Sequence, residues 1–510
     1  MDALAAWAAR TPDKAAVIFT ETGHADDERL SFATLDARSN RVAQWLLSLG
    51  LAPGDTVAMV MENCAEVFEI GFACARLGLY YTPINWHLTP REVAHVLRDS
   101  RARIALTTPR SAELGHAAAA EAGGPEMIVT GPGGGYEAAL ERFPEVRALP
   151  EDRPIGRDFL YSSGTTGLPK GVRKPLAQSL ETSSDAAEIA AWRRNYGFDE
   201  GAVYLSPAPL YHAAPLRFCM RVVEVGGTCV VMRKFDAEGA LAAIARHGVT
   251  HSQWVPTMFV RMLALPEEAK AAHDLSSMRV AVHAAAPCPV HVKQRMFDWW
   301  GPIIYEYYGG SEGFGITSIA PQDWLAHPGS VGKATLGIIH ILDDDGNELP
   351  VGEIGQIWFE GGPPFEYFND PDKTRKALNA KGWATYGDIG HVDAEGYLYL
   401  SDRRVDLILS GGVNVYPKEI EDVIMAHPDV ADVAVIGVPH PEFGEEVKAI
   451  VELHDPDRGG PAEAAMLAEF VESRLPKFKR PRSWEFERLP RLANGKLMKR
   501  QLKDRYRVPA

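Results

Sequence analysis

The sequence predicts an α/β fold in two parts, a large N-terminal domain and a small α+β domain at the C-terminal end. The chain has 510 residues, 46% of them hydrophobic, which is more than one ordinary domain contains. Strand-like and helix-like segments alternate along much of it, as in folds with largely parallel sheets. Near Asp402 this pattern changes, and about a hundred residues follow, a normal size for a separate domain.

The elements of the large part are predicted from short apolar runs, which indicate strands, and from longer segments with helical spacing. A surface helix is expected at the N-terminus. The further elements expected in chain order are a strand at 57–61, a helix at 68–79, a strand at 228–235, a helix at 237–247, a strand at 278–284, a helix at 290–300 and a strand at 303–308.

The small part begins after a charged segment at 402–406. Its expected elements are a helix at 418–426, strands at 431–438 and 446–453, a helix at 462–475 and a last strand near 484–486. In the second helix, Leu467, Phe470, Val471 and Leu475 share one helical face. We therefore predict an N-terminal domain at 1–401, a hinge at 402–406 and a C-terminal domain at 407–510.

Charge and cysteine content limit the classes of function. The chain has 53 Lys and Arg against 68 Asp and Glu, a net charge of −15, which argues against general nucleic-acid binding. Its five cysteines are scattered with no CxxC pair, as expected of free thiols in a reducing compartment. No apolar run of about 18 residues and no signal peptide are seen. We therefore expect a cytoplasmic protein without a membrane span.

The segment YSSGTTGLPKGV at 161–172 is a glycine-rich, hydroxyl-rich loop with one lysine. It is not a Walker A loop, because Pro169 and Gly171 stand where that motif needs Gly and Ser or Thr. The glycine spacing also excludes the dinucleotide pattern. Backbone N–H groups, hydroxyls and Lys170 still suit phosphate. A plain surface loop is the alternative, but such loops rarely follow an apolar strand directly.

The stretch SSGTTGLPKGV resembles the phosphate-binding signature of the acyl-adenylate-forming enzymes, the superfamily of acyl-CoA synthetases, luciferases and peptide-synthetase adenylation domains. Four further motifs follow in the order of that superfamily: YGGSE at 308–312, YGD at 386–388, DRRVDLILSGG at 402–412 and LPRLANGK at 489–496. Ser311 and Tyr386 replace threonines of the usual pattern, and Val405 replaces a polar hinge residue. The resemblance implies layered α/β subdomains with a small barrel-like part, and a mobile C-terminal domain.

The resemblance also implies a role for each motif residue. Ser162, Ser163, Gly164, Thr166, Gly167 and Lys170 would bind the β- and γ-phosphates of ATP, with Thr165 and Lys496 catalytic. Tyr308 would stack on the adenine, and its neighbours Gly309, Gly310 and Ser311 would also bind the cofactor. Asp388 and Arg403 would bind the ribose, and Ser410, Gly411 and Gly412 would line the coenzyme A channel. Glu312 would be both catalytic and the Mg²⁺ ligand. His212 would act at the wall between the acyl pocket and that channel, although a structural histidine is an equal alternative.

These roles predict an ATP-dependent acid:CoA ligase that uses ATP, Mg²⁺ and coenzyme A. The segments expected to line the acyl pocket, such as 254–259 and 283–286, are rich in small or apolar residues. We therefore expect a hydrophobic, bulky acid of the steroid, terpenoid or fatty type, as in similar bacterial ligases. The alternatives are a ligase that loads a carrier protein or performs one half-reaction, and a non-catalytic binding homologue. A homodimer is left open.

Overall fold

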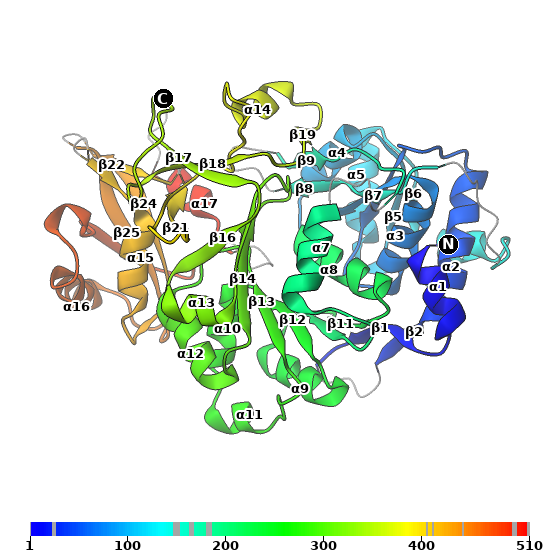
Figure 1. The fold of residues 1–510 in the computed structure, drawn as a ribbon, viewed down its shortest axis with the longest axis horizontal. Helices are drawn as coiled ribbons and strands as arrows, with labels where there is room; N and C mark the ends of the chain where they lie inside the picture. Colours follow the sequence, from blue (N-terminus) through cyan, green and yellow to red (C-terminus); the bar gives the residue numbers. More distant parts are fainter. Residues whose placement is uncertain are drawn as a thin grey trace.

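The computed structural model describes residues 2–22, 27–145, 153–162, 168–179, 186–403, 406–410, 413–440, 443–491 and 497–506. Their strands form two large sheets, a short three-stranded sheet and a separate C-terminal sheet. Figure 1 shows the blue and cyan N-terminal elements at one side of the molecule and the orange and red C-terminal elements at the other.

The first sheet is parallel throughout and joins five described strands in the order β6-β5-β3-β4-β7. They are β3 (Thr56–Val60), β4 (Tyr80–Ile84), β5 (Ala102–Thr107), β6 (Met127–Val129) and β7 (Arg157–Asp158). Helices connect the first four, because parallel strands need a crossover connection. These are α3 (Ala65–Leu77), α4 (Pro90–Asp99) and, after the short η1 (Pro109–Ser111), α5 (Ala112–Ala122).

The second sheet joins thirteen described strands in the order β17-β18-β20-β21-β16-β15-β14-β13-β12-β10-β11-β1-β2. They are β1 (Ala15–Thr20), β2 (Glu28–Ser31), β10 (Val203–Ser206), β11 (Thr228–Met232), β12 (His251–Trp254), β13 (Val280–His283), β14 (Ile304–Gly309), β15 (Ile316–Ile319), β16 (Ser330–Leu336), β17 (Ile338–Leu342), β18 (Gly355–Glu360), β20 (Asp388–Val392) and β21 (Leu398–Arg403).

The direction of pairing changes at β14. The neighbours from β1 through β11, β10, β12 and β13 to β14 run parallel. The pairs from β14 to β17 run antiparallel. The expectation of largely parallel sheets is therefore wrong for this end of the sheet, where short turns rather than helices connect many of the strands. The barrel-like part remains a prediction.

The remaining helices of the large part lie on the sheets and at their edges (Figure 1). They are α1 (Ala3–Arg10), α2 (Phe32–Ser48), α6 (Gly135–Leu140), α7 (Ala186–Tyr196), α8 (Ala213–Glu224), α9 (Ala237–His247), α10 (Pro256–Leu263), α11 (Glu267–Ala271), α12 (Val290–Trp300), α13 (Pro321–Ala326) and α14 (Pro371–Lys376). The predicted helices at 237–247 and 290–300 match α9 and α12. In α9 the side chain of Asp236 caps the first turn, and Gly248 ends the helix with a left-handed φ of 61°.

The short sheet has the order β19-β9-β8 and consists of β8 (Leu160–Ser162), β9 (Lys170–Arg173) and β19 (Glu366–Tyr367). The C-terminal sheet has the order β23-β22-β25-β24, with β26 beside β25. Its elements are β22 (Ile408–Ser410), β23 (Val413–Val415), α15 (Pro417–Met425), β24 (Val430–His440), β25 (Gly444–Leu453), α16 (Pro461–Glu472), η2 (Lys477–Lys479), β26 (Ser483–Phe486) and α17 (Lys499–Asp504).

The C-terminal elements have a hydrophobic core of their own. Leu467, Val471 and Leu475 are buried in it, and Phe470 packs against it, as the shared helical face predicts. The neighbouring strands β21 and β22 belong to different sheets, and the predicted hinge at 402–406 includes the last two residues of β21. Motion at this hinge, and the domain bounds, remain predictions.

Two expectations from composition can be compared with the structure. All five cysteines are free thiols, four of them buried. In the part of the chain that the structure describes, no helix combines the length and the apolar character needed to cross a membrane. The cytoplasmic location remains a prediction.

Candidate active site

The predicted phosphate-binding loop joins two paired strands. Ser162 ends β8 and Lys170 begins β9, and these two residues lie opposite each other in the antiparallel pairing. The hairpin therefore brings both ends of the loop together. The predicted residues inside the loop lie outside the described residues: Ser163, Gly164, Thr165, Thr166 and Gly167.

The YGGSE motif lies at the carboxyl end of β14, the strand at which pairing changes from parallel to antiparallel. Tyr308 and Gly309 are the last residues of the strand, and Gly310, Ser311 and Glu312 follow. Ligands of open α/β sheets bind at the carboxyl ends of strands, where the topology switches. A Cβ atom on Gly310 would lie only 2.4 Å from a ring carbon of Tyr386 and 2.6 Å from Glu312 Oε2, so this close approach requires glycine.

Tyr308 joins the second motif to the third. Its hydroxyl donates a hydrogen bond of 2.6 Å to Oδ2 of Asp388, a buried residue eighty positions further along the chain. Asp388 begins β20 and lies opposite Arg403, the last residue of β21. Three of the predicted nucleotide-binding motifs therefore meet at one place. The side chain of Arg403 lies outside the described part.

Tyr386, which replaces the usual threonine of the third motif, packs in an aromatic cluster. Its ring stacks on Phe314 with 4.0 Å between ring centroids, and it meets Tyr308 edge-on at 5.8 Å. Its hydroxyl donates to the carbonyl oxygen of Gly315 at 2.9 Å. The larger residue is therefore accommodated by packing, and it supports Tyr308 from the side.

Glu312 is held by a tyrosine that the sequence analysis missed. The hydroxyl of Tyr367, in β19, donates to Oε1 of Glu312 at 2.6 Å. Burial, with the adjacent Glu312 carboxylate, raises the pKa of Tyr367, so the phenol remains a protonated donor. Tyr367 also pairs with Val172 of β9, which ties it to the strand that carries Lys170. The only local signal for this residue is a short aromatic run before α14.

A second lysine that the sequence analysis missed lies beside Lys170. Lys373 is in the first turn of α14, and its ammonium lies 3.9 Å from the centroid of the Tyr367 ring. Burial and the adjoining ammonium of Lys170 lower the pKa of Lys373 to about 7, although Glu312 and Asp370 act in the opposite direction. One lysine in a charged helix has no local pattern that could have revealed this position.

The half-buried Arg217 and the buried Lys174 lie beside the YGGSE loop. Arg217 of α8 forms an ion pair of 2.8 Å with Asp158 of β7 and also donates to the carbonyl oxygen of Ser311 at 3.5 Å. Lys174 is only 2% exposed, and a Cβ atom on Gly313 would lie 2.4 Å from its Nζ. These contacts fix the backbone that presents Glu312.

The segments predicted to line the acyl pocket place large side chains together. Trp254, Phe259 and His283 are all buried, and the rings of Phe259 and His283 are 5.6 Å apart. His212 is the N-cap residue of α8, and its ring contacts Tyr211 at 4.5 Å. The role of His212 between the acyl pocket and the coenzyme A channel remains a prediction.

Three buried ionisable side chains, one of them the His283 of this lining, are in contact with one another. Lys293 of α12 forms an ion pair of 2.6 Å with Glu306 of β14, and His283 Nε2 is 3.3 Å from the same carboxylate oxygen. Burial lowers the pKa of His283. Burial opposes ionisation of Glu306, but His283 and Lys293 together lower its pKa to about 2. The carboxylate is therefore charged and compensated.

The residues predicted for the second reaction step lie in the C-terminal part. Ser410 ends β22 and lies opposite Val413 of β23. Gly411, Gly412 and the predicted catalytic Lys496 lie outside the described residues. Within the described ranges, no group of three or more His, Cys, Asp and Glu side chains is arranged to hold a metal ion.

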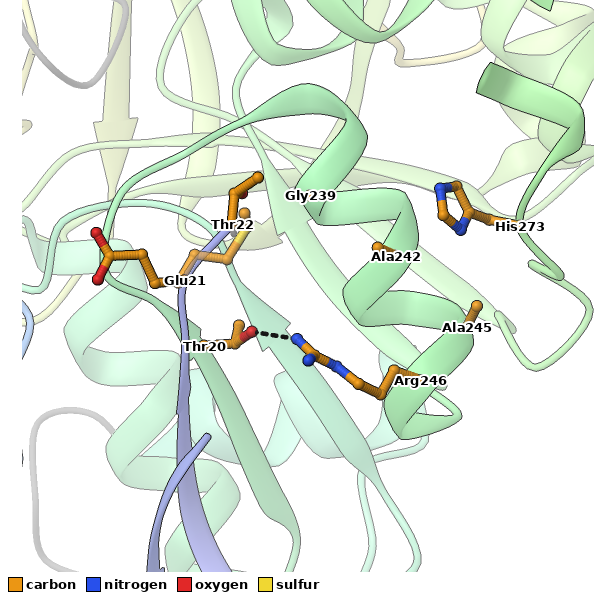
Figure 2. A pocket seen from close by; sticks show the side chains of 9 residues that line it. Thr20, Glu21, Thr22, Gly239, Ala242, Ala245, Arg246 and His273 are labelled. Atoms are coloured by element: carbon orange, nitrogen blue, oxygen red, sulfur yellow. Dashed lines mark hydrogen bonds between the residues drawn. The ribbon is translucent and has the colours of Figure 1, made fainter. Parts of the chain in front are cut away.

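A separate surface cavity of about 510 Å³ lies beside β1 and α9 (Figure 2). It is lined by Thr20, Glu21, Thr22, Met232, Gly239, Ala242, Ala245, Arg246 and His273. Arg246 donates a hydrogen bond of 2.7 Å to Thr20 across it. None of the motif residues lines this cavity, so it is not the predicted active site.

Two family descriptions match the chain. Residues 4–365 match the AMP-binding enzyme family, and residues 419–496 match the AMP-binding enzyme C-terminal domain. The first match alone covers more than half of the chain.

Characterised proteins resemble nearly the whole chain. The fatty acid–acyl-carrier-protein ligase ScoC of Streptomyces coeruleorubidus is 33% identical over 493 residues, 94% of this chain and 92% of ScoC. A feruloyl-CoA synthase of Amycolatopsis sp is 33% identical over 492 residues, 94% of either chain. The crystal structure of ATP-bound MatB from Rhodopseudomonas palustris superposes with a TM-score of 0.83 at 30% identity and covers 99% of both chains. The chain therefore belongs to the AMP-binding enzyme family, the adenylate-forming superfamily that its motifs resemble, within the acyl-CoA synthetase branch.

Proposed function

We propose that this enzyme is an ATP-dependent acid:CoA ligase that activates a hydrophobic, bulky carboxylic acid of the steroid, terpenoid or fatty type. The hydrogen bond between Tyr308 and Asp388 is the observation that carries the proposal. It joins the residue expected to stack on the adenine with the residue expected to bind the ribose. Glu312, two residues beyond Gly310, would then face the phosphates at the same strand end.

In the first half-reaction, a carboxylate oxygen of the acid attacks the α-phosphorus of ATP. The bond between the α- and β-phosphates breaks, and pyrophosphate leaves with its negative charge. Tyr308, Asp388 and Lys170 would hold the two ends of the nucleotide, so that catalysis depends mainly on positioning. Lys496 would bridge the attacking carboxylate and the α-phosphate as charge shifts between them. No covalent bond to the enzyme is formed.

Mg²⁺ fits the donor set around Glu312. The ion prefers oxygen ligands and usually takes them from one or two carboxylates and from substrate phosphates. Glu312 would supply the carboxylate, and Tyr367 would keep it in place through the 2.6 Å hydrogen bond. When bound, the ion would neutralise charge on the departing pyrophosphate.

In the second half-reaction, the sulfur of coenzyme A attacks the acyl carbonyl carbon. The bond to the phosphate oxygen breaks, AMP leaves, and the thiol proton passes to solvent. Ser410, Gly411 and Gly412 would line the channel for the thiol after rotation at 402–406. The position of that segment between two separate sheets supports such a rotation.

The residues expected to line the acyl pocket, and the acids named for two similar enzymes, support a hydrophobic substrate. Trp254 and Phe259 give the expected pocket wall an apolar character, and the charges of Glu306 and Lys293 compensate each other instead of facing a substrate charge. A feruloyl-CoA synthase and a fatty-acid ligase are both about equally similar to this chain, which favours an apolar acid and leaves its shape open.

Loading of a carrier protein is the second candidate function, and the similarity to ScoC favours it. One screen separates the two. Pyrophosphate release is measured with fatty, aryl, steroid-like and terpenoid acids, and coenzyme A or a carrier protein is then added to each active acid. The proposal requires release with an apolar acid and an acyl-CoA product. Release with polar acids alone, or transfer only to a carrier protein, would contradict it.

A further inference from the structure

Lys373 lies next to the lysine of the phosphate-binding loop, although the two are far apart in the sequence. Lys170 begins β9, and β9 pairs with β19, which leads into α14. The ammonium of Lys170 lies close enough to lower the pKa of Lys373 through its charge. The short sheet therefore places two cations side by side.

The position of Lys373 is fixed by several contacts. Its backbone N–H donates to Oδ1 of Asp370 at 3.0 Å, which caps the start of α14. Thr374, the next residue, accepts a 3.0 Å hydrogen bond from the backbone N–H of Tyr367. The ammonium of Lys373 then lies 3.9 Å from the centre of the Tyr367 ring. Lys373 is therefore half-buried, and hydrogen bonds hold its backbone segment in place.

Glu312 lies on the other side of the same tyrosine. The Tyr367 hydroxyl donates to Glu312, so one side chain contacts both the cation and the expected magnesium ligand. Two ammonium groups held together repel each other, and burial increases the cost. A ligand with several negative charges would offset this repulsion, whereas a neutral ligand would not.

We propose that Lys373 is a second cationic ligand for the β- and γ-phosphates of ATP and for the pyrophosphate that leaves, acting beside Lys170. This inference rests on the proposed function, which brings a triphosphate to this strand end. The chemistry required is that of a polyphosphate anion, because a bridging oxygen anion can accept hydrogen bonds from both ammonium groups at once. Lys373 would bind the leaving group and would not contact the reacting α-phosphorus.

The alternative is that Lys373 only supports the Tyr367 ring through a cation–π contact. Magnesium-free inorganic pyrophosphate separates the two ideas, because its binding does not need Glu312 as a metal ligand. The probe is titrated into the full-length protein in a calorimeter with a chelator present. AMP, which lacks the β- and γ-phosphates, is the second probe.

The test compares Lys373→Gln with Lys376→Gln, an exposed lysine on the same helix, and with Lys373→Arg. A charge-assisted hydrogen bond is lost in the first variant alone, so its affinity for pyrophosphate should fall on the order of tenfold. Affinity for AMP should stay the same in all three variants. Lys376→Gln should bind pyrophosphate like the wild type, and Lys373→Arg should recover most of the loss.

Unchanged pyrophosphate binding in Lys373→Gln would overturn the inference, and so would an equal loss of AMP binding or no recovery in Lys373→Arg. The measurement needs no carboxylic acid and no coenzyme A. A screen that finds no acid substrate would therefore contradict the proposed function but would not affect the pyrophosphate-binding result. Unchanged pyrophosphate binding in Lys373→Gln would overturn the inference about Lys373 but would not affect the proposed function.

Discussion

Tyrosine hydroxyls hold the acidic residues of the predicted active site. Tyr308 donates to Asp388 and Tyr367 donates to Glu312, each at 2.6 Å. A phenol is an apolar ring with one polar end, so it can fill a packed cluster and still orient a carboxylate. Each pair joins parts of the chain that are 80 and 55 residues apart. The acids thus have fixed positions that their own neighbours in sequence do not provide.

Replacing Tyr308 by Phe tests this role directly. The ring remains for stacking, but Asp388 loses one donor in a buried site, which should cost about 1–3 kcal/mol of stability. The KM for ATP should rise on the order of five- to tenfold, which is about 1–1.4 kcal/mol, while the KM for the acid stays near the wild-type value. ATP-dependent pyrophosphate release and a urea titration measure the two effects. A rise in both KM values by the same factor would show a general distortion instead.

His251 gives a residue-level prediction about pH. It is buried in β12, its ring stacks on Phe198, and Nε2 is 2.9 Å from the carbonyl oxygen of Tyr196. Burial lowers the pKa of His251 to about 4 from an ordinary value of 6.5. The unfolded chain therefore binds more protons between these values. The stability from the neutral ring is fully present above pH 6.5 and is lost as the pH falls towards 4.

At pH 5 this loss should be about 2 kcal/mol relative to pH 7. Urea titrations at both pH values, on the wild type and on His251→Gln, measure it. The variant should be less stable at pH 7, because it loses ring packing, but its drop between pH 7 and pH 5 should be smaller by about that amount. Equal drops in the two proteins would assign the pH dependence to other groups.

At the level of elements, β13, β14 and α12 are joined by charge inside the core. Lys293 and His283 reach Glu306 from α12 and β13, and all three side chains are buried. Trp254 and Phe259, from the expected lining of the acyl pocket, belong to the same hydrophobic core as buried residues of these three elements. Removing one partner of a buried ion pair leaves an uncompensated buried charge, which costs free energy. The pair of Lys293 and Glu306 therefore holds α12 against β14, the strand that ends in the YGGSE motif.

Breaking this pair from one side should therefore cost more than removing both charges. Lys293→Met should destabilise the protein by about 3–5 kcal/mol, since Glu306 is left buried without its cation. The double variant Lys293→Met with Glu306→Leu should recover most of that loss. Unfolding midpoints of the two single variants and the double variant give the coupling. Additive losses would show that the charges do not act as a pair.

At the level of the whole molecule, the two half-reactions are predicted to use different faces of the C-terminal part. Lys496 belongs to the last motif, and Gly412 lies in the motif that follows the hinge, so rotation at 402–406 could bring each to the site in turn. The C-terminal sheet has its own core of buried residues, which is what a rigid moving part requires. The two residues thus offer a matched pair of variants.

Lys496→Ala should abolish pyrophosphate release and leave acyl-CoA formation from supplied acyl-adenylate near the wild-type rate. Gly412→Leu should do the opposite, because a large side chain would block the channel for the thiol but not the first step. Both half-reactions are assayed separately in each variant. If either variant lost both activities equally, the assignment of its residue to one step would be wrong.

The sequence by itself determined the motifs, their order and many of the elements. SSGTTGLPKGV and YGGSE are contiguous, so their residue types and spacing can be recognised without a fold. The helices α9 and α12 are marked by local spacing, and α9 also by the cap at Asp236. Hydrophobic period and capping act within a few residues, which is why such elements can be predicted locally.

Only the tertiary structure decided which residues meet at the site. Lys373 and Arg217 carry no local signal, and Tyr367 has only a short aromatic run. Yet Tyr367 contacts Glu312, Lys373 adjoins Lys170, and Arg217 donates to the Ser311 carbonyl oxygen. The change from parallel to antiparallel pairing at β14 was also missed. These features depend on the order in which strands lie in the sheets, and that order arises from burial over the whole chain rather than from any short stretch of sequence.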